Sequence, residues 1–278
     1  MAGTVAEIER DLAELRDSSS EPGHPPTLRT SVMTHLAWVP EEWAEAAELT
    51  LAGLAERHPS RTILLFPHAG EDAFEADASL QCFPYGDRAV CAEVIRIHLG
   101  GERAQHPASV VAPMLVADLP VFCRWRGQPA FDEVFDELVG VVDRLIVDST
   151  EWDPDLGPPY AELAARFERV AVSDIAWERT ERWRRMLANA WPFEARSIRV
   201  QGTHAQAALL GGWLSSRLGH DVEVEHEPAD VLNAVAVDGA PIDAPPGEPP
   251  PPSDLLSDQL DQFGRDRIYE DAVRAAAR

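Results

Sequence analysis

The sequence predicts an α/β fold, because short apolar strands alternate with helical patterns along most of the chain. Its 278 residues, 45% of them hydrophobic, fit two domains, since natural domains cluster at about 100 to 150 residues. The stretch 240–252 is dominated by proline, which is typical of a semi-rigid extended linker. We therefore expect two α/β domains with mixed, largely parallel sheets covered by helices, then a proline-rich linker and a C-terminal helical tail.

A second break in composition lies in the segment 151–159, which holds three prolines and a glycine. This segment is the preferred domain boundary, and the glycines at 100 and 101 mark an alternative. The expected parts are an N-terminal α/β domain at 1–152, a C-terminal α/β domain at 153–239, the linker at 240–252 and the helical tail at 253–278.

The first elements follow from hydrophobic spacing. Apolar residues at helical spacing between Val5 and Leu15 predict an amphipathic helix over residues 4–17, and a polar loop at 18–26 follows it. The next elements expected are a strand at 27–39, a helix at 40–54 and a strand at 61–66.

A β-hairpin is expected next. Residues 74–82 alternate apolar and polar side chains, which indicates a half-buried strand. The dipeptide Gly86-Asp87 can form a two-residue turn, so that a second strand returns along the first. In that register the facing pairs are Tyr85 with Arg88, Pro84 with Ala89, and Cys82 with Cys91.

Beyond the hairpin, strands and helices alternate, which implies parallel strands covered by helices. Up to residue 167 we expect a helix from about 107, a strand at 119–125, a helix at 131–141, a strand at 144–147 and a helix at 160–167. The later elements expected are a strand at 169–172, a helix at 178–191, a strand at 197–201, a helix at 205–218 ended by Gly219, and strands at 222–225 and 232–237.

The charged residues exclude several classes of enzyme. The chain has 48 acidic residues against 24 basic ones, a net charge of −24, and every basic residue is arginine. Without lysine there can be no Schiff base, no phosphate-loop lysine and no lysine general base. This excludes pyridoxal-phosphate enzymes, P-loop NTPases and protein kinases.

The same acidity disfavours a nucleic-acid partner, because the surface would repel a phosphate backbone. It is also typical of solubility in a GC-rich bacterial proteome, and a partner with a basic surface is the alternative interpretation. The N-terminus lacks a signal-peptide pattern, and no apolar run approaches the roughly 20 residues of a membrane span. Three cysteines without CxxC spacing fit a reducing compartment. We expect a cytoplasmic protein.

The sequence lacks the common motifs for catalysis and cofactor binding. The sequence contains no GxGxxG phosphate cradle and no GxSxG nucleophile elbow, and Gly211-Gly212 lies in a helical pattern that favours close helix packing. His220 and His226 flank a strand about 20 Å apart, too far to share a metal. We therefore expect no catalytic residues, no metal site and no cofactor.

Cys82 and Cys91 form a candidate redox pair. The hairpin register places them opposite each other, and facing residues of antiparallel strands have Cα atoms about 4.5 to 5.5 Å apart, within disulfide range. The alternative is that both are small buried hydrophobic residues, since free cysteine is usually buried.

Tryptophan and arginine recur together in two places. The first is Arg124-Trp125-Arg126-Gly127 at the end of a predicted strand. The second contains Trp177, Arg179, Trp183 and Arg184 near the start of a predicted helix. Open α/β sheets place binding sites at strand ends, and Trp and Arg dominate interface hot spots. The candidate partner-binding residues are Trp125, Arg126, Trp177, Arg179, Trp183 and Arg184. The alternative is that each arginine pairs locally beside a core tryptophan.

A set of motifs between residues 105 and 220 recurs in a known family. They are Ser109-Val110-Val111, Asp118-Leu119-Pro120-Val121-Phe122, Trp125-Arg126-Gly127, Asp143-Arg144-Leu145-Ile146-Val147-Asp148-Ser149, Asp174-Ile175-Ala176-Trp177, Arg179, Trp183-Arg184, Ala208-Leu209-Leu210, Gly212-Trp213-Leu214 and Arg217-Leu218-Gly219. In these motifs the chain resembles the glucose-6-phosphate dehydrogenase assembly protein OpcA family of actinobacteria and cyanobacteria. Four tail residues also fit, namely Asp266, Tyr269, Glu270 and Ala272. Many members have an aromatic residue where this chain has Arg124, and residues 1–100 match only in pattern.

The resemblance implies a non-catalytic auxiliary protein that binds glucose-6-phosphate dehydrogenase and promotes its active oligomer. Such an allosteric activator would support NADPH production in the oxidative pentose phosphate pathway. No family catalytic residues are carried over. The alternative function is a sugar-phosphate-binding enzyme or metabolite sensor in which Arg124, Arg126, Arg179 and Arg184 hold the anion at strand ends. A structural scaffold without effect on activity is a third hypothesis.

Overall fold

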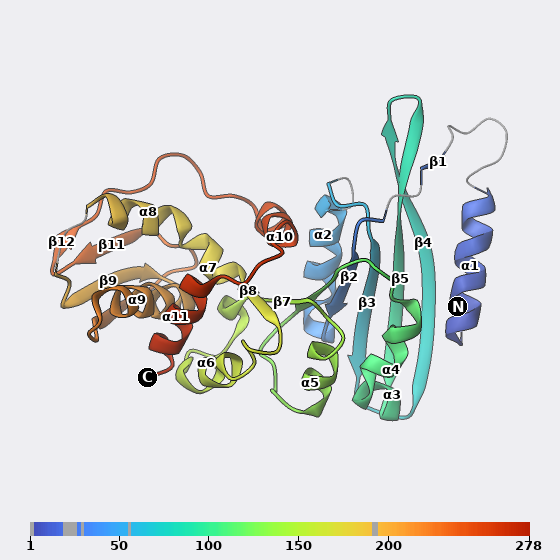
Figure 1. The fold of residues 1–278 in the computed structure, drawn as a ribbon, viewed down its shortest axis with the longest axis horizontal. Helices are drawn as coiled ribbons and strands as arrows, with labels where there is room; N and C mark the ends of the chain where they lie inside the picture. The colour runs from blue at the N-terminus through green and yellow to red at the C-terminus, as the bar shows by residue number, and fades with distance from the viewer. Residues whose placement is uncertain (1–2, 19–26, 29–30, 55–56, 191–193) are drawn as a thin grey trace. The chain divides into compact units, whose positions relative to one another are not determined.

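The computed structural model describes residues 3–18, 27–28, 31–54, 57–190 and 194–278 (Figure 1). The chain divides into two compact units. Unit 1 comprises Met1–Leu145 with Pro252–Asp261, and unit 2 comprises Ile146–Pro251 with Gln262–Arg278. Each unit combines β-strands with helices, which confirms the predicted α/β class. In the described ranges no helix is long and apolar enough to cross a membrane.

The larger sheet is largely parallel. Its strand order is β1-β5-β3-β2-β6-β7-β8, and β4 pairs with β5 outside this path. The strands are β1 Thr27–Leu28, β2 Thr34–Trp38, β3 Arg61–His68, β4 Ala73–Tyr85, β5 Arg88–Gly100, β6 Val121–Trp125, β7 Arg144–Val147 and β8 Ala171–Asp174. β2 pairs in parallel with β3 and β6, and β5 pairs in parallel with β1 and β3, whereas β4 runs antiparallel to β5. The strand expected at 27–39 is thus two strands, and the polar loop expected at 18–26 lies almost wholly outside the described residues.

Helices cover both faces of this sheet in unit 1. They are α1 Val5–Ser18, η1 Glu41–Trp43, α2 Ala44–Leu54, α3 Gly101–Gln105, α4 Pro107–Val111, η2 Ala112–Met114, α5 Glu133–Val139 and α10 Pro252–Leu260. α2 packs Ala47 and Leu51 against a core cluster that includes Leu64 of β3. α5 packs Phe135 against Trp125 of β6. Parallel strands buried in this way read as nearly continuous apolar runs, as β3 does.

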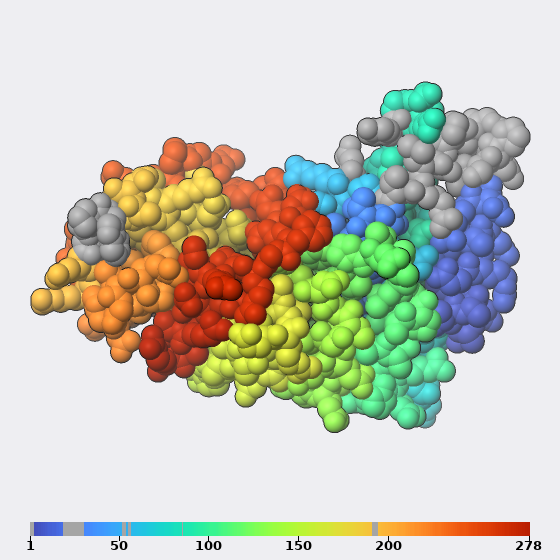
Figure 2. All heavy atoms as spheres, in the orientation of Figure 1, coloured from blue at the N-terminus to red at the C-terminus, as the bar shows by residue number. Residues whose placement is uncertain are grey.

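The β4–β5 hairpin has the predicted register. Tyr85 pairs with Arg88, Pro84 with Ala89 and Cys82 with Cys91 around the turn at Gly86, whose φ is 62°. A disulfide joins Cys82 to Cys91, so the two sulfur atoms are not separate buried thiols in this structure. In Figures 1 and 2 the hairpin tip projects past the neighbouring strands of unit 1.

Unit 2 also contains a smaller sheet with the order β10-β9-β11-β12. The elements of this unit besides β8 are η3 Ser149–Glu151, α6 Gly157–Ala164, α7 Ile175–Arg179, α8 Glu181–Asn189, β9 Ser197–Gly202, α9 His204–Leu218, β10 Glu223–Pro228, β11 Ala234–Val237, β12 Ala240–Pro241 and α11 Arg267–Ala276. Ile198 and Val200 of β9 are buried with residues of α8 and α9. On the opposite face, Arg199 is exposed and its Nε lies 2.7 Å from Glu225 Oε2. The small sheet therefore has one covered face and one polar face.

The division between units falls at Leu145, whereas the sequence placed the boundary at residue 152. The residues directly after β7 bond partners in unit 2: Asp148 accepts hydrogen bonds from Arg179, and Ser149 donates to Asp174. These contacts attach the residues that precede the 151–159 segment to unit 2.

The tail expected as one helical segment forms two helices that belong to different units. α10 is part of unit 1, where Ser257 Oγ lies 2.6 Å from His58 Nε2 and Asp254 pairs with Arg57 at 2.8 Å. α11 is part of unit 2 and buries Tyr269. The helix breaks between them, where Asp266 caps α11 by accepting hydrogen bonds from the backbone N–H groups of Ile268 and Tyr269.

Candidate functional site

The first predicted Trp/Arg cluster lies at the end of β6 in unit 1. The Trp125 ring stacks on Trp38, with centroids 5.1 Å apart and planes 19° apart, and meets Phe135 edge-on at 5.0 Å. β2 and β6 pair in register at these tryptophans, which places both rings on one face of the sheet. Trp125 is therefore a core side chain.

Arg126 leaves the strand on the other face. Its NH2 donates to the Ala46 carbonyl at 3.0 Å and to Thr50 Oγ1 at 3.1 Å, both on α2, and its guanidinium lies 5.7 Å from the Trp43 ring centroid. Gly127 follows with a φ of 72°, a conformation that favours glycine. Arg126 thus ties the end of β6 to α2.

The second predicted cluster begins with Trp177 on α7 in unit 2. Its indole Nε1 donates to Asp266 Oδ2 at 3.0 Å, and the Arg184 guanidinium carbon lies 3.5 Å from the ring centroid. Burial lowers the pKa of Arg184 to about 10, partly opposed by nearby acids, first of all Glu178. A cation this close to an indole face in a desolvated setting is strongly attracted to it.

Arg179 and Trp183 complete the second cluster. Nη1 of Arg179 donates to both carboxylate oxygens of Asp148 at 2.8 Å and to Thr150 Oγ1 at 3.2 Å. Trp183 belongs to the core of the small sheet, and its Nε1 lies 3.3 Å from the Leu232 carbonyl that accepts its hydrogen. The arginine is anchored locally, and the tryptophan packs as core.

The structure therefore divides the six predicted partner-binding residues between the two units. The tryptophans are buried, with 5% of Trp125, 3% of Trp177 and 5% of Trp183 exposed. The arginine side chains reach solvent more, and 27% of Arg179 is exposed. A direct role of either cluster in binding a partner stays a prediction.

A polar network at the ends of β7 and β8 was not predicted. Ser149 Oγ donates to Asp174 Oδ2 at 2.6 Å, and the backbone N–H groups of Ser149 and Ala176 donate to Asp174 Oδ1 at 3.0 and 2.8 Å. The Tyr160 hydroxyl donates to Ser149 Oγ at 2.9 Å, and the Tyr269 hydroxyl lies 3.4 Å from Asp174 Oδ2. The signal for it was the pair Asp148-Ser149 after one parallel strand and Ser173-Asp174 at the end of the next.

Burial dominates the electrostatics of this network. It raises the pKa of Asp174 to about 6, with repulsion from Asp148 as the next cause and the Ser149 hydrogen bonds opposing it. Burial also raises the pKa of Tyr160 and of Tyr269 well above the usual value, and the Asp174 charge adds to both shifts. The Ser149 hydroxyl already donates to a carboxylate and accepts from a phenol. The arrangement holds the two strand ends together and leaves no imidazole on that hydroxyl to activate it.

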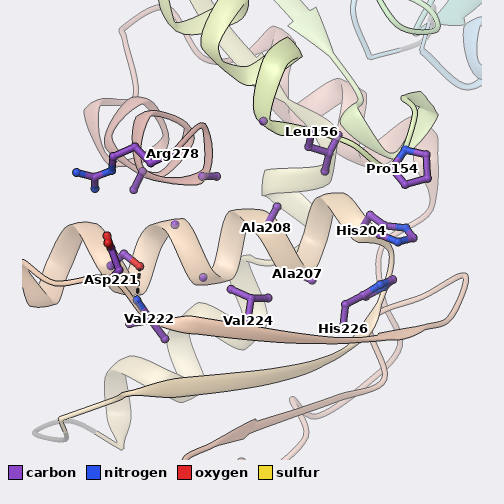
Figure 3. A pocket seen from close by; sticks show the side chains of 16 residues that line it. Pro154, Leu156, His204, Ala207, Ala208, Asp221, Val222, Val224, His226 and Arg278 are labelled. Atoms are coloured by element: carbon purple, nitrogen blue, oxygen red, sulfur yellow. Dashed lines mark hydrogen bonds between the residues drawn. The ribbon is translucent and has the colours of Figure 1, made fainter.

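Unit 2 also contains a groove of about 490 Å³ between α9, β10 and the end of α11 (Figure 3). Small side chains of α9 form its floor, including Ala207 and Ala208. At one end the rings of His204 and His226 lie with centroids 4.0 Å apart, and Figure 3 shows the rings together there. His226 Nε2 lies 2.8 Å from the Gly202 carbonyl, which can only accept, so Nε2 carries the hydrogen.

The two histidines were not predicted as neighbours. They are 22 positions apart in the sequence, and only the return of β10 alongside β9 brings His226 to the start of α9. Partial burial, followed by the repulsion of His226, lowers the pKa of His204. In the described part of the chain, no group of three or more His, Cys, Asp or Glu residues is arranged to hold a metal ion.

The packing role expected for Gly211 and Gly212 is confirmed. A Cβ on Gly211 would lie 2.2 Å from Val224 Cγ2, and one on Gly212 would lie 2.3 Å from the Ala272 carbonyl oxygen. Glycine at these positions therefore lets α9 approach β10 on one side and α11 on another. Figure 2 shows the red surface of α11 bordering the orange surface of α9.

Two family models match consecutive parts of this chain. A model described as the glucose-6-phosphate dehydrogenase subunit N-terminal domain matches residues 52–167. A model described as the C-terminal domain of that subunit matches residues 170–248. Together the matches cover well over half of the chain.

Two relatives carry the name OpcA. The chain is 28% identical over 186 residues to the OxPP cycle protein OpcA of Nostoc punctiforme and 29% identical over 184 residues to that of Synechocystis sp.. Each alignment covers 59% of this chain but 39% and 38% of the two relatives, so the chain spans about two fifths of their length. Among solved structures, the WlbA dehydrogenase from Thermus thermophilus, in complex with NAD and UDP-GlcNAcA, matches with a TM-score of 0.46 and 13% identity over 88% of this chain and 94% of that one.

Proposed function

The chain belongs to the glucose-6-phosphate dehydrogenase assembly protein OpcA family, and on that basis we propose that it binds this dehydrogenase and promotes its active oligomer. The match of both family domains, one after the other, is the observation that carries the proposal. In this role the chain is a non-catalytic allosteric activator in the cytoplasm. It would support the supply of NADPH in the oxidative pentose phosphate pathway.

Activation by assembly needs only differential binding. A protein that binds the assembled dehydrogenase more tightly than its separate subunits shifts the population toward the assembled state. At a concentration one hundred times its dissociation constant, such a binder stabilises that state by about 2.7 kcal/mol. This is about a hundredfold change in the equilibrium between the two states, and no chemical step by the activator is required.

We assign the contacts to the arginines of the two clusters. Arg126, Arg179 and Arg184 each contact a residue of their own unit, which limits the side-chain entropy lost on binding. The buried tryptophans would act by fixing the elements that carry these arginines. Each arginine would keep these contacts and donate its further guanidinium N–H groups to the partner.

The sugar-phosphate alternative has less support from the same geometry. Arg124 is buried and donates to the Trp125 carbonyl, and the Arg179 guanidinium is bonded by both oxygens of Asp148. A phosphate would have to displace these acceptors. If it nonetheless binds, millimolar glucose 6-phosphate or 6-phosphogluconate should raise the melting temperature of the chain.

The test of the proposal measures NADPH formation by the dehydrogenase of the same organism over a range of enzyme dilutions. Promotion of an active oligomer predicts that adding this chain raises the rate most in dilute enzyme, where the oligomer dissociates. Equal rates with and without the chain at every dilution would contradict the proposal.

Matched variants test the contact assignment. Arg126→Gln and Arg179→Gln should each weaken binding at least tenfold, because a charge-paired hot-spot arginine is lost. Arg185→Gln is the control, since Arg185 is largely exposed and pairs only one turn away with Glu181. Unchanged far-UV circular dichroism at the assay temperature must accompany the loss, so that weaker binding does not reflect unfolding. Equal binding by all three variants would refute the assignment while leaving the proposed function in place.

A further inference from the structure

Strand β10 forms one edge of the small sheet, and its outer side is open. The backbone N–H of Glu223 donates to the Arg196 carbonyl, and that of Ala229 donates to the Gly202 carbonyl, both on the β9 side. Because N–H directions alternate along a strand, the N–H groups of Val224 and His226 point away from β9. No strand in the described ranges pairs with that side. Pro228, at the next outward position, has no N–H to offer.

The groove of unit 2 runs along this open edge. Val224 and His226 line it from β10 and Val222 lines it just before that strand, and Figure 3 shows the side chains of Val224 and His226 pointing toward α9. The floor is α9, with Ala208 among its small residues, and the opposite wall includes Pro154, Leu156 and the end of α11. Val224 is 39% exposed, an apolar side chain at the rim. A groove between an edge strand and a helix is the geometry that accepts an extended peptide as an added strand.

The charge beside this edge identifies the kind of peptide. Glu223, Glu225 and Glu227 alternate with the groove-lining residues, so their side chains lie on the opposite, polar face. Arg199 is the cation beside them, 2.7 Å from Glu225 and 3.6 Å from Glu227. This edge has a net negative charge, because the three glutamates outnumber the single arginine. An incoming strand needs basic residues on that face.

The same charges argue against a second copy of this chain. If β10 paired antiparallel with its own copy, glutamates of one copy would face glutamates of the other across the new ladder. Like charges directly opposite one another destabilise a strand pair. Acidic residues on edge strands are a recognised protection against such self-association.

We propose that β10 binds an extended segment of a partner protein as an added strand, with small apolar side chains entering the groove and arginines or lysines facing the glutamates. Successive same-face side chains of a strand lie about 7 Å apart, so two apolar residues would fit along the groove lined by Val222, Val224 and His226. The backbone N–H groups of Val224 and His226 donate to the incoming strand. The identity of the partner rests on the proposed function, which makes it the dehydrogenase.

Residue-resolved hydrogen exchange tests the added strand, first with saturating dehydrogenase and then with a synthetic peptide that alternates valine and arginine. The amides of Val224 and His226 should exchange at least tenfold more slowly in either complex, whereas Glu223 and Glu225, already bonded to β9, should change little. A peptide alternating valine and glutamate is the control and should give no protection.

The experiments with the dehydrogenase and with the peptide distinguish failure of the added strand from failure of the proposed function. If the dehydrogenase binds but the Val224 and His226 amides exchange as before, the added strand is overturned and the proposed function stands. If the dehydrogenase does not bind, the proposed function fails. The valine–arginine peptide then tests the strand site by itself: slower exchange of the Val224 and His226 amides supports the site, and unchanged exchange overturns it.

A charge reversal gives a second readout. Glu223→Lys should weaken the valine–arginine peptide at least fivefold, because a carboxylate facing its arginines is replaced by an ammonium. Glu248→Lys, an exposed acid of the same unit in the proline-rich segment, is the matched control and should bind as the native chain does. Equal affinities for the two variants, with unchanged circular dichroism, would contradict the charge assignment and with it the basic segment.

Discussion

Different interactions stabilise the strand ends of the two units. In unit 1, Trp125 at the end of β6 is fixed by ring contacts with Trp38 and Phe135. In unit 2, the ends of β7 and β8 are fixed by charged and hydrogen-bonded groups around Asp174, and Trp177 lies between a carboxylate and a guanidinium. One Trp–Arg sequence pattern thus accompanies an apolar junction in one unit and a polar network in the other.

This difference predicts different sensitivities. Apolar stacking responds to loss of volume but hardly to pH, because none of its groups titrates. A buried polar network is costly to break, since each partner left behind is an unpaired buried group. The strand ends of unit 2 should therefore respond to pH and to single-atom changes that the ring contacts of unit 1 tolerate.

The largest effect is expected from removing the two tryptophans. Trp125→Ala should lower the free energy of unfolding of unit 1 by about 3 to 5 kcal/mol, the usual cost of a large core truncation. Trp177→Ala should cost unit 2 more, because it also removes one hydrogen bond to Asp266 and the ring that faces Arg184. Both losses in free energy of unfolding can be measured by urea denaturation, with hydrogen exchange reporting on each unit separately. An equal or smaller loss for Trp177→Ala would break the comparison.

The second effect is the pH dependence from Asp174. Its folded-state pKa of about 6 lies above the unfolded value of about 3.9, so the folded state binds the proton more tightly. The stability it contributes is complete below pH 4 and is lost as the pH rises through 6, a change of about 1 to 3 kcal/mol. Asp174→Asn should remove this loss. The free energy of unfolding of unit 2 should then change less between pH 4 and 7 than it does in the native chain.

His35 on β2 provides the opposite sign in unit 1. Burial, then the charges of Arg124 and His58, lowers the pKa of His35 to about 4. The stability it contributes is therefore complete above pH 6.5 and is lost as the pH falls through 4. If the two units lost stability in the same direction across this range, the assignment of these two groups would be contradicted.

The third effect concerns the disulfide of unit 1. Reducing the Cys82–Cys91 bond reopens a loop with a sequence separation of 9, which should cost about 2 kcal/mol locally. Amides near the hairpin tip should then exchange faster, whereas unit 2 should be unchanged. Mass mapping without reductant is the check. Two free thiols under oxidising conditions would rule out the redox pair, and an unchanged activation of the dehydrogenase after reduction would rule out a switch.

The smallest effect compares the two arginines. Arg184→Met should cost unit 2 about 2 kcal/mol, because its guanidinium is desolvated against Trp177 at 3.5 Å. Arg126→Met should cost unit 1 about 1 kcal/mol, since its guanidinium lies 5.7 Å from the Trp43 ring. Methionine keeps most of the alkyl stem, so thermal unfolding reports mainly on the lost charge. The reverse order would contradict the comparison.

Local sequence rules were sufficient where one short stretch decides the structure. The Gly86-Asp87 turn determined the register of β4 with β5, and the structure has that register at Cys82 and Cys91. The four residues of β7, Arg144–Val147, agree with the prediction to the residue. The glycines of α9 were expected to serve packing, and they do.

The features missed depend on contacts between distant parts of the chain. Asp174 is bonded by Ser149, which precedes it by 25 positions, and it faces Tyr269, which follows it by 95. His204 and His226 meet only because β10 returns beside β9. The tail divides between the units because α10 buries its apolar residues in unit 1, whereas α11 buries its apolar residues in unit 2. Apart from the polar residues at the ends of β7 and β8, the sequence carries no local signal for these contacts.

The most direct test of the central claim is the mass of the dehydrogenase by analytical ultracentrifugation, at a concentration where its oligomer partly dissociates. With this chain added, the account predicts a shift to a larger species that contains both proteins. A mass distribution identical with and without the chain, at concentrations up to the micromolar range, would contradict the assembly role.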